Sequence, residues 1–557
     1  MNLIPAQIRR LNISLFIIFI LFMTLIIRAG YLIIGQKDFL LGENQKRVER
    51  QVDVTPTRGM ILDRNGLPLA VSKKTYTMTI DPRKANIDAQ QVKTISHLLN
   101  IEEGQIIKAI NSQKHYRIIA KKVSVKNKLA LSSIPALNFE EQEVRVYPAS
   151  ESAATVVGFL NAKKEGVQGV ERYHHPVLSG GKGRLSYVVD ALGHVVGEKT
   201  MVRPLIFGED VHLTIDAHLQ MQVYGALKQS LAKFGGKSGM VLVSEVKTGD
   251  ILAMVNFPSF NPNEAITGFN PMRGNPIIEE RFEPGSTIKP IWLAWLMNRG
   301  HIDLDTTIST SPGFLKVDQQ VVKDAQDNGQ LSLTEIIKKS SNVGMVKIVM
   351  DMPYQWVEEM MIDMRLSHHR AVGLPGEISG DINHKIAVSK FAKVVSSFGY
   401  GIEITPLELA RAYAIIASGG VDHPLHIHKD KRIKSERVID RSAAKAVQQM
   451  LYEVVEGGTG YRAKVKGVKV AGKTGTTHKL VEGSYKDTAH RASFIGFAPL
   501  ENPQYLVMVI LDEPSGKWHY GGTSAAPLFS KVMQATLNDL ARNSKLLKNQ
   551  GKEGNVR

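Results

Sequence analysis

One apolar segment near the N-terminus constrains the fold of this 557-residue chain more than any other feature. Residues 11–27 read LNISLFIIFILFMTLII and contain no charged side chain. At about 1.5 Å per residue, a helix of this length spans roughly 25 Å, and residues 29–34 extend the apolar stretch beyond Arg28. Such a helix has no polar face to turn toward water. We therefore predict a membrane anchor at residues 11–34.

A cleaved signal peptide and a buried core helix are the alternative interpretations of this segment. The apolar part of a signal peptide is usually about 7–15 residues long and ends at a small-residue cleavage site, which Ala29-Gly30-Tyr31 matches poorly. Arg9 and Arg10 precede the segment, and such positive flanks stay on the cytoplasmic side. We expect one membrane span, with residues 1–10 in the cytoplasm and the chain from about residue 35 onward outside.

Composition limits the remaining classes of function. Hydrophobic residues make up 43% of the chain and charged residues 22%, which is typical of folded domains. The net charge of +17 would suit a polyanionic partner, but the excess is spread along the chain and no nucleic-acid-binding signature occurs. We therefore expect no nucleic-acid partner. The absence of cysteine excludes disulfides, thiolate-bound metals and a catalytic thiol.

The part that follows the anchor divides into two regions. Residues 35–215 begin with a charged stretch, carry a hairpin signal at Asn65-Gly66 and contain no apparent catalytic constellation. They predict an elongated, non-catalytic pedestal or dimerisation-like module. Residues 216–545 form a second domain, which begins where Asp216 can cap a helix that runs to Phe234. Residues 546–557 are left as a C-terminal tail.

The second domain carries strand signals at both ends and helix signals between them. Ser332-Leu-Thr-Glu335 and Thr405-Pro-Leu-Glu408 both match a capping box. This order predicts an α+β domain with an antiparallel sheet flanked by helices. The predicted strands cover residues 238–246, 251–257, 468–476, 493–498 and 505–511, and a last helix covers residues 525–541.

A Ser-x-x-Lys pair can supply a nucleophile and its base, but only on a helix, where residues three apart share a face. Ser179 precedes glycines in an expected loop, and Ser244 lies in an expected strand. Ser230 and Ser442 lie on ordinary amphipathic helices. Ser286 alone follows a Glu-Pro-Gly turn and begins a helix, where free N–H groups favour developing negative charge. We therefore select Ser286 from the five serines that match this pattern.

Three further motif elements support this choice. Lys289 lies one turn after Ser286 among apolar residues, which can lower the pKa of its amine enough to make it a base. Ser340-Ser341-Asn342 follows a predicted helix, and Lys473-Thr474-Gly475-Thr476 ends a predicted strand. Similar letters occur at Ser259-Phe-Asn261 and Lys247-Thr-Gly249, so the specificity lies in the ordered set. The S-S-N motif starts 54 residues after Ser286, and K-T-G-T starts another 133 residues further on.

With these motifs the sequence resembles the penicilloyl serine transferases, and most closely the class B penicillin-binding proteins of the cell-division (septal, FtsI) type. The resemblance extends from the anchor to about residue 540. Asn342 favours the septal type, because elongation-type relatives usually carry Asp there. Thr477 replaces the Ala of many relatives and concerns only the local fit of β-lactams. The stretches that carry the resemblance are TPTRGMILDRNGLPLAVS, RFEPGSTIKP, KSSNVG, SFGYGIEITPLELARAYA, GGTGYRAKVKGVKVAGKTGT and YGGTSAAPLFSKV.

The resemblance implies a role for each motif residue. Ser286 would attack the penultimate D-Ala carbonyl of a peptidoglycan stem peptide, and Lys289 would take its proton. Ser340 and Asn342 would relay the proton and hold the substrate amide. Lys473 would supply positive potential. The substrate-binding residues would be Thr474, Gly475 and Thr476, and the N–H groups of Ser286 and Thr476 would form the oxyanion hole.

The resemblance also implies the fate of the acyl-enzyme and the partners. An amine of a neighbouring stem peptide would resolve the acyl-enzyme into a cross-link, and β-lactams would trap Ser286. A separate membrane glycosyltransferase of the division machinery would polymerise the lipid-linked precursor, and the anchor and pedestal would dock against it and other divisome proteins at the septum. No cofactor and no metal are implied. The acceptor amine (diaminopimelate or lysine) and the oligomeric state stay open.

Three alternatives to a transpeptidase fit the sequence less well. Hydrolysis of the acyl-enzyme, as in a carboxypeptidase or β-lactamase, is disfavoured by the size, anchor and N-terminal module, and no class A deacylating Glu motif is apparent. A β-lactam sensor would be expected to carry more spans and a cytoplasmic signalling part. Metal-dependent hydrolysis finds little support, because His174-His175 and His368-His369 are adjacent pairs without the spacing of a zinc-binding helix. We expect both pairs in surface loops.

Overall fold

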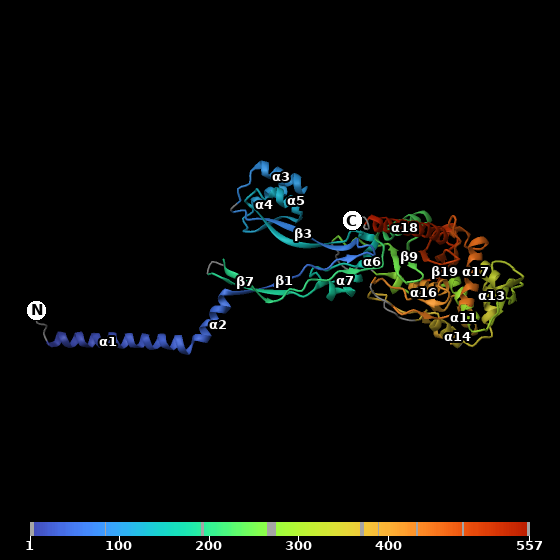
Figure 1. Ribbon diagram of the computed structural model, residues 1–557, viewed down its shortest axis with the longest axis horizontal. Coiled ribbons are helices and arrows are strands. Elements are labelled where there is room, and N and C mark those ends of the chain that lie inside the picture. Colours follow the sequence, from blue (N-terminus) through green and yellow to red (C-terminus); the bar gives the residue numbers. More distant parts are fainter. Residues whose placement is uncertain are drawn as a thin grey trace. The chain divides into compact units, whose positions relative to one another are not determined.

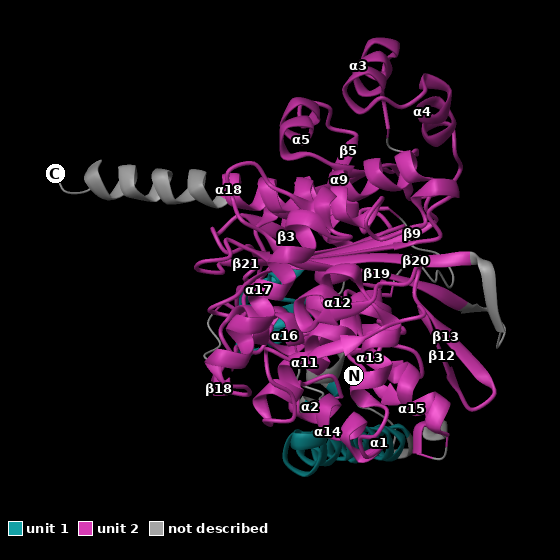
Figure 2. Cartoon of the chain, turned by 90° about the vertical axis from the view of Figure 1, so that its right-hand side faces the viewer, with its two compact units in different colours: residues 1–58, 179–208 teal, residues 59–178, 209–557 magenta. Residues whose placement is uncertain are grey.

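The computed structural model describes residues 5–553, apart from residues 84, 191–193, 265–273, 368–371, 388, 430–432 and 482–483. The chain forms two compact units, residues 1–58 with 179–208 and residues 59–178 with 209–557 (Figure 1, Figure 2). The sequence predicts a domain boundary between residues 215 and 216, and the two units do not separate there. That boundary remains a prediction. The pair His368-His369 lies outside the described residues.

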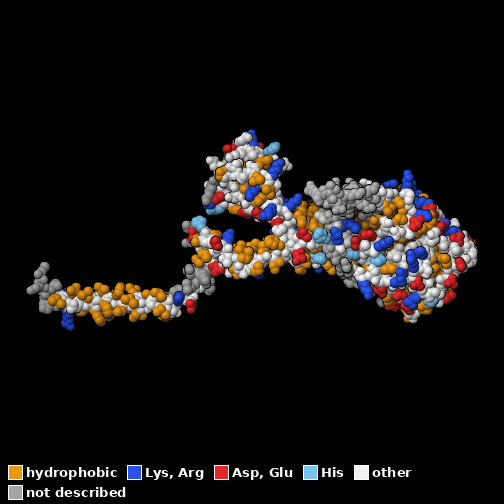
Figure 3. All heavy atoms as spheres, in the orientation of Figure 1, with side chains coloured by type: hydrophobic (Ala, Val, Ile, Leu, Met, Phe, Trp, Pro, Cys, Tyr) orange, Lys and Arg blue, Asp and Glu red, His pale blue; other side chains and the backbone are white. Residues whose placement is uncertain are grey.

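The first unit contains the apolar N-terminal segment as a continuous helix. α1 covers Pro5–Gly30, and a π-helical turn at Tyr31–Gly35 and α2 at Lys37–Val48 follow it. Residues 7–35 are long and apolar enough to cross a membrane, and their hydrophobic side chains are exposed. Figure 3 shows these hydrophobic side chains along the visible face of α1. Their arrangement suits contact with lipid better than contact with water.

The remainder of the first unit is a three-stranded antiparallel sheet. Its strand order is β1-β6-β7, and Val52 pairs with Leu185 in its register. The Arg184 guanidinium donates a hydrogen bond of 2.8 Å to Asp53 across this pair and lowers the pKa of the Asp53 carboxyl. The strands are β1 at Glu49–Val54, β6 at Gly183–Val189 and β7 at Val195–Arg203.

The second unit begins with a separate layer of strands and helices. The predicted hairpin at Asn65-Gly66 is confirmed, because Ile61 pairs with Ala70 and Gly66 has the positive φ of 83° that a tight turn requires. Three helices pack on the β3, β4 and β5 strands around Met78 and Ile95. The elements are β2 Ile61–Leu62, β3 Pro68–Ile80, α3 Ala89–Leu99, α4 Glu103–Ile110, β4 Arg117–Val123, α5 Val125–Leu131, β5 Leu137–Val146, α6 Ala154–Val157, α7 Gly169–Tyr173, α8 His175–Ser179 and β8 Val211–His212.

A five-stranded antiparallel sheet with helices on both faces forms the centre of the second unit, as the α+β prediction required (Figure 2). Its strand order is β10-β9-β21-β20-β19, so β19 lies at one edge. Side chains alternate between the two faces of each strand. Val241 and Val243 of β9 therefore pack with α9 (Ala217–Phe234) and α18 (Ala525–Glu553), whereas Met240 and Leu242 pack with helices on the opposite face. The strands are β9 Ser238–Glu245, β10 Ile251–Phe257, β19 Ala471–Val481, β20 Ser484–Ala498 and β21 Tyr505–Asp512.

The helix signals of the sequence are largely confirmed. The Asp216 side chain accepts hydrogen bonds from the first turn of α9, which ends at Gly235 in a left-handed conformation. Ser332 and Thr405 both form the predicted capping boxes. The last helix extends further than predicted and runs into the expected C-terminal tail. The helices are α9 Ala217–Phe234, α10 Pro276–Glu279, α11 Lys289–Asn298, α12 Leu333–Lys339, α13 Asn342–Val349, α14 Gln355–Asp363, α15 Lys390–Ser396, α16 Pro406–Ala417, α17 Arg441–Gly457 and α18 Ala525–Glu553.

Among the described residues, four small antiparallel strand pairs lie between the helices, and the sequence does not predict them. Each strand has two to four residues, which is too short to show the alternation of apolar and polar residues that identifies a strand in a sequence. The pairs are β11 Thr307–Ser309 with β14 Gln330–Ser332, β12 Phe314–Val317 with β13 Gln320–Lys323, β15 Asp381–Ile382 with β16 Ile402–Glu403, and β17 Val421–Asp422 with β18 Glu436–Arg437.

Candidate active site

Ser286 lies at the start of a helix, as predicted. A 3₁₀ turn at Gly285–Ile288 contains Ser286 and leads directly into α11, which ends at Asn298. The side chain of Ser286 is half-buried. Gly285 has a φ of 57°, and a Cβ at that position would lie 2.3 Å from Cγ2 of Thr477. Close packing against β19 therefore fixes the backbone that presents Ser286.

A second glycine packs against the same turn from the other side. Gly399 has a φ of 89°, and a Cβ there would lie 2.3 Å from the backbone N and O of Gly285. We expect Gly399→Ala to destabilise the fold by about 3 kcal/mol, because overlap with backbone atoms adds to the cost of a left-handed residue. Gly401→Ala is the matched control, since its φ is 76° but its nearest contact would be 3.7 Å away. Thermal unfolding of both variants measures the difference, and equal losses would contradict this account of the turn.

Lys289 is completely buried beneath Ser286 and does not bond to it in this structure. Its Nζ donates hydrogen bonds of 2.7 Å to the Ser340 carbonyl oxygen and 2.7 Å to Oδ1 of Asn342, and Oγ of Ser340 lies 3.3 Å away. Within the described part of the chain, the Ser286 hydroxyl forms no hydrogen bond. Bonds between a nucleophile and its base often form only in the substrate complex.

Burial holds the pKa of the Lys289 amine well below its usual range, and the nearby charge of Lys473 lowers the pKa further. A neutral amine has two N–H groups and one lone pair. Two carbonyl oxygens, which can only accept, take the two N–H groups. The lone pair is therefore left to accept a proton from a third group, as a general base must.

The S-S-N motif lies where α12 ends and α13 begins. Ser340 has a φ of 60°, a left-handed conformation that is costly for a residue other than glycine and that often marks functional sites. This conformation places its hydroxyl between the two lysines, 3.3 Å from Nζ of Lys289 and 3.0 Å from Nζ of Lys473. Ser341 caps α13 through its hydroxyl, which accepts a hydrogen bond from the N–H of Gly344.

Asp324 holds the S-S-N turn and was not found from the sequence. Its carboxylate accepts hydrogen bonds from the Ser341 hydroxyl at 2.5 Å and from the N–H groups of Asn342 and Val343 at 2.6 and 3.0 Å. Its negative charge also acts on Lys289 and raises the pKa of that amine against the larger effect of burial. In the sequence, Asp324 is an acidic residue after a short run of β-branched residues. This pattern is too common to identify Asp324 as a site residue.

The K-T-G-T motif lies in the first half of β19, which corrects the prediction that it ends a strand. Lys473 is completely buried, and burial lowers the pKa of its amine to about 7. The Thr474 hydroxyl shares a hydrogen bond of 2.7 Å with Thr459, and the Thr476 hydroxyl accepts one of 3.0 Å from the N–H of Gly521. A Cβ at Gly475 would lie 2.3 Å from Oγ of Ser493 and 2.9 Å from Cγ2 of Thr287. Close packing therefore requires glycine at position 475.

Residues of the S-x-x-K and S-S-N motifs line one groove of about 540 Å³. Its lining includes Ser286, Ser340, Asn342, Asp324 and Thr459. Lys289 and Lys473 lie below this surface and reach it through the Ser340 hydroxyl. The arrangement therefore combines a nucleophilic hydroxyl, a base of lowered pKa and a second cation in one place.

The other Ser-x-x-Lys serines are not part of this groove. Ser179 ends a short helix instead of lying in a loop. Ser244 is buried in β9, and its hydroxyl has no hydrogen-bond partner among the residues that the structure describes. His174 is half-buried and packs against His428 with ring centroids 4.6 Å apart, which corrects the expected surface loop. Among the described residues, no group of three or more His, Asp or Glu side chains is placed to hold a metal ion.

Two known protein families match this chain, each over a different range of residues. Residues 239–534 match the penicillin binding protein transpeptidase domain, and residues 53–213 match the penicillin-binding protein dimerisation domain. The first match covers the groove and all of its motif residues.

Individual proteins match over nearly the full length. The peptidoglycan D,D-transpeptidase FtsI of Buchnera aphidicola (from Schizaphis graminum) is 34% identical, and the match covers 96% of this chain and 95% of that protein. FtsI of Escherichia coli K12 is 32% identical over 92% of this chain and 89% of its own. The crystal structure of penicillin-binding protein 3 of Mycobacterium tuberculosis with aztreonam is 26% identical, with a TM-score of 0.68 over 88% of this chain and 97% of that chain.

Proposed function

Because the chain belongs to the penicillin-binding protein family and is a serine-type D,D-transpeptidase, we propose that it cross-links peptidoglycan stem peptides during septal cell-wall synthesis. The observation that carries this proposal is the Ser340 hydroxyl, which two buried lysines hold beside the groove of Ser286. The name FtsI of the relatives in Buchnera and Escherichia coli supports the septal role.

Acylation begins when Oγ of Ser286 attacks the carbonyl carbon of the penultimate D-Ala. Lys289 takes the hydroxyl proton through its lone pair, since its N–H groups already point at carbonyl oxygens. The N–H groups of Ser286 and Thr476 bind the charge that develops on the substrate oxygen. Ser340 passes a proton from the lysine pair to the leaving nitrogen, and the amide bond to the terminal D-Ala breaks.

The substrate is held by groups on either side of Ser286. Lys473, Thr474 and Thr476 bind its C-terminal carboxylate, and Asn342 holds the substrate amide. Gly475 serves this strand by allowing it to pack against Thr287. An amine of a second stem peptide then attacks the acyl-enzyme, forms the new amide and returns the proton to Ser286 Oγ. β-Lactams acylate the same hydroxyl, and the aztreonam complex of the mycobacterial relative supports this step.

The charge of Asp324 gives the mechanism a testable pH dependence. We expect Asp324→Asn to shift the acid limb of the acylation rate to lower pH, because the lost carboxylate raises the pKa of Lys289 in the unaltered protein. The Asn side chain can still accept the hydrogen bonds of Asn342 and Val343. The rate of Ser286 acylation by a fluorescent penicillin is measured from pH 5 to 9, and the pH at which the rate falls by half on the acid side locates the acid limb. If the acylation rate fell equally at every pH and the acid limb did not shift, Asp324 would act only by holding the shape of the S-S-N turn.

The location is proposed from the N-terminal helix. Residues 11–34 cross the inner membrane once, with residues 1–10 in the cytoplasm and the pedestal of residues 35–215 and catalytic domain of residues 216–545 in the periplasm. Arg9 and Arg10 support this orientation. The anchor and pedestal would dock on a membrane glycosyltransferase of the division machinery, which supplies uncross-linked strands. Tethering both enzymes raises their effective concentration.

Product analysis tests the proposed reaction. The purified full-length chain is incubated in liposomes with lipid-linked precursor and a peptidoglycan glycosyltransferase, and the stem peptides are analysed by mass spectrometry. Cross-linked dimers, absent from a Ser286→Ala variant, are expected. Release of D-Ala without dimers would show a carboxypeptidase instead.

Deleting residues 1–35 is expected to leave acylation by penicillin intact and to abolish the ability of the protein to support division in cells. Cell division restored by the truncated protein would contradict the proposed role of the anchor.

A further inference from the structure

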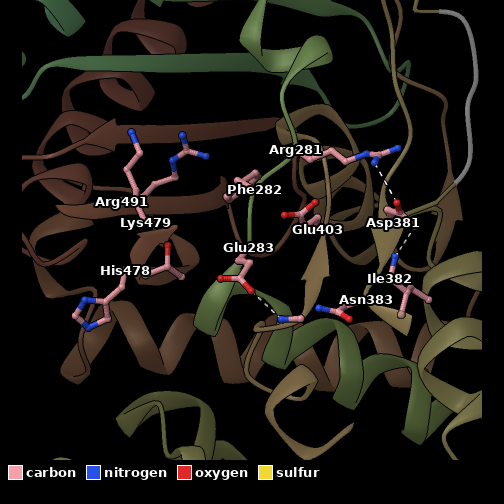
Figure 4. A pocket seen from close by; sticks show the side chains of 12 residues that line it. Arg281, Phe282, Glu283, Asp381, Ile382, Asn383, Glu403, His478, Lys479 and Arg491 are labelled. Carbon is pink, nitrogen blue, oxygen red and sulfur yellow. Dashed lines mark hydrogen bonds and ion pairs between the residues drawn. The ribbon is translucent and has the colours of Figure 1, made fainter. Parts of the chain in front are cut away.

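One segment of the chain, residues 399–413, holds the turn that carries Ser286. Phe282 pairs with Ile404 in a short antiparallel bridge, through hydrogen bonds of 2.9 and 3.0 Å. The Glu283 carboxylate accepts a hydrogen bond of 2.8 Å from the N–H of Gly401 (Figure 4). These contacts fix the chain before Ser286, and the proposed mechanism uses none of them.

The chain after Ser286 contains a buried carbonyl group that the helix itself does not satisfy. Ile288 is the N-cap of α11, so its carbonyl is the first that accepts a hydrogen bond of the helix. Thr287 lies before that point and is completely buried. In the 3₁₀ pattern its carbonyl would accept from the N–H of residue 290, but Pro290 has no N–H. The Thr287 carbonyl therefore requires a donor from elsewhere in the fold.

The hydroxyl of Tyr413 is that donor. Tyr413 lies on α16, and its O–H donates a hydrogen bond of 2.8 Å to the Thr287 carbonyl oxygen. Burial raises the pKa of this hydroxyl well above its usual range, so it keeps its proton and stays a donor at neutral pH. The Tyr413 side chain is completely buried and cannot touch a substrate in the groove. Any effect of Tyr413 on the reaction is therefore indirect.

The peptide group that Tyr413 holds lies midway between the nucleophile and its base. It joins Thr287 to the next residue, where the 3₁₀ turn that contains Ser286 passes into the helix that begins at Lys289. A rotation of this peptide group would turn Ser286 relative to Lys289. It would thereby change how closely Oγ of Ser286 can approach the lone pair of Nζ.

We propose that Tyr413 is a positioning residue for acylation, which orients Ser286 toward Lys289 through its hydrogen bond to the Thr287 carbonyl. The inference rests on the proposed function and adds to it a residue outside the groove. Without the hydroxyl, the buried carbonyl is left without its donor, and the turn is free to relax. A misplacement of reacting groups by about 1 Å can slow a reaction roughly 100-fold. The affinity of the groove for penicillin depends on other residues and should not change.

Tyr413→Phe tests this role on the full-length chain in detergent, because it removes the hydroxyl and keeps the ring. Labelling by a fluorescent penicillin is followed over a range of concentrations. This series separates the rate constant of acylation at saturation from the concentration that gives half of that rate. We expect the rate constant to fall about tenfold and the half-saturating concentration to change by less than about twofold. The acid limb should keep its pH, because the charges that act on Lys289 are unaltered.

Tyr224→Phe is the matched control. Tyr224 is also buried, and its hydroxyl donates a hydrogen bond of 2.9 Å to Glu151 from α9, outside the segment that holds the turn. This variant should keep the rate constant of the unaltered chain. The amount of label at saturation counts the folded sites in each variant, and thermal unfolding is measured in parallel.

Three results would overturn the positioning role. They are an unchanged rate constant in Tyr413→Phe, an equal loss of rate in Tyr224→Phe, and a loss in Tyr413→Phe that is confined to the amount of label or to the half-saturating concentration. Each of these results leaves the proposed function standing, because the unaltered chain is still acylated. An unaltered, folded chain that takes up no label would instead refute the proposed function itself.

Discussion

Lys289→Arg is expected to reduce acylation of Ser286 by penicillin about 10²–10⁴-fold while the protein stays folded. The guanidinium keeps its proton at any pH at which the protein is folded, so it cannot take the proton of Ser286. It can still donate to the Ser340 and Asn342 oxygens that Nζ now contacts at 2.7 Å. A loss of activity with preserved hydrogen bonds therefore isolates the role of the lone pair. The initial rate of labelling by a fluorescent penicillin measures the loss.

Lys393→Arg is the matched control for this substitution. Lys393 also donates to two carbonyl oxygens, those of Met350 and Met352 at 2.8 and 2.6 Å, and burial also lowers the pKa of its amine. It lies outside the groove, so its replacement should leave the labelling rate near that of the unaltered chain. If Lys289→Arg also labels at a near-normal rate, Lys289 contributes only positive charge and another group takes the proton.

Lys473→Met is expected to slow acylation about 100-fold at low pH, because the hydrogen bond from its ammonium group to Ser340 and the proposed contact with the substrate carboxylate are both lost. The loss should shrink as the pH rises through about 7, where Lys473 of the unaltered chain gives up its own charge. The acid limb should also move to higher pH, because the charge of Lys473 lowers the pKa of Lys289. Asp324→Asn should move it in the opposite direction.

A pH series of labelling rates for Lys473→Met and Lys473→Arg measures both effects. The Arg variant keeps its charge at all these pH values, so its acylation rate should stay above that of Lys473→Met. Its rate should also not fall through pH 7, where Lys473 of the unaltered chain loses its charge. A loss in Lys473→Met that does not change with pH would mean that Lys473 acts through packing. It is completely buried, so thermal unfolding is measured alongside to separate that outcome.

Much of the fold could be predicted because its signals are local. The capping boxes at Ser332 and Thr405 and the helix start at Asp216 each depend on side chains within one turn of the helix they begin. The order S-x-x-K, S-S-N and K-T-G-T could likewise be read without a structure. The structure adds that Lys289, Ser340 and Lys473 are in contact, which no spacing of 54 or 133 residues can show by itself.

The errors arose where tertiary pairing overrides the local pattern. β19 was predicted to end at Thr476, because polar residues follow it, yet pairing with β20 carries it on to Val481. Asp324 belongs to the site only because the β12–β13 pair brings it to the N-terminus of α13, 17 residues from Ser341. Tyr413 gave no signal for the same reason, since only the packing of α16 against α11 brings its hydroxyl to Thr287, 126 residues away in the sequence.

The identity of the acylated residue tests the central claim most directly. The full-length chain is labelled with penicillin, digested with trypsin and analysed by mass spectrometry. The adduct is expected on the peptide of residues 282–299, in which Ser286 is the single serine and Lys289 is protected from cleavage by Pro290. An adduct on a peptide that contains Ser179, Ser230, Ser244 or Ser442, or a folded chain that takes up no label, would contradict the account.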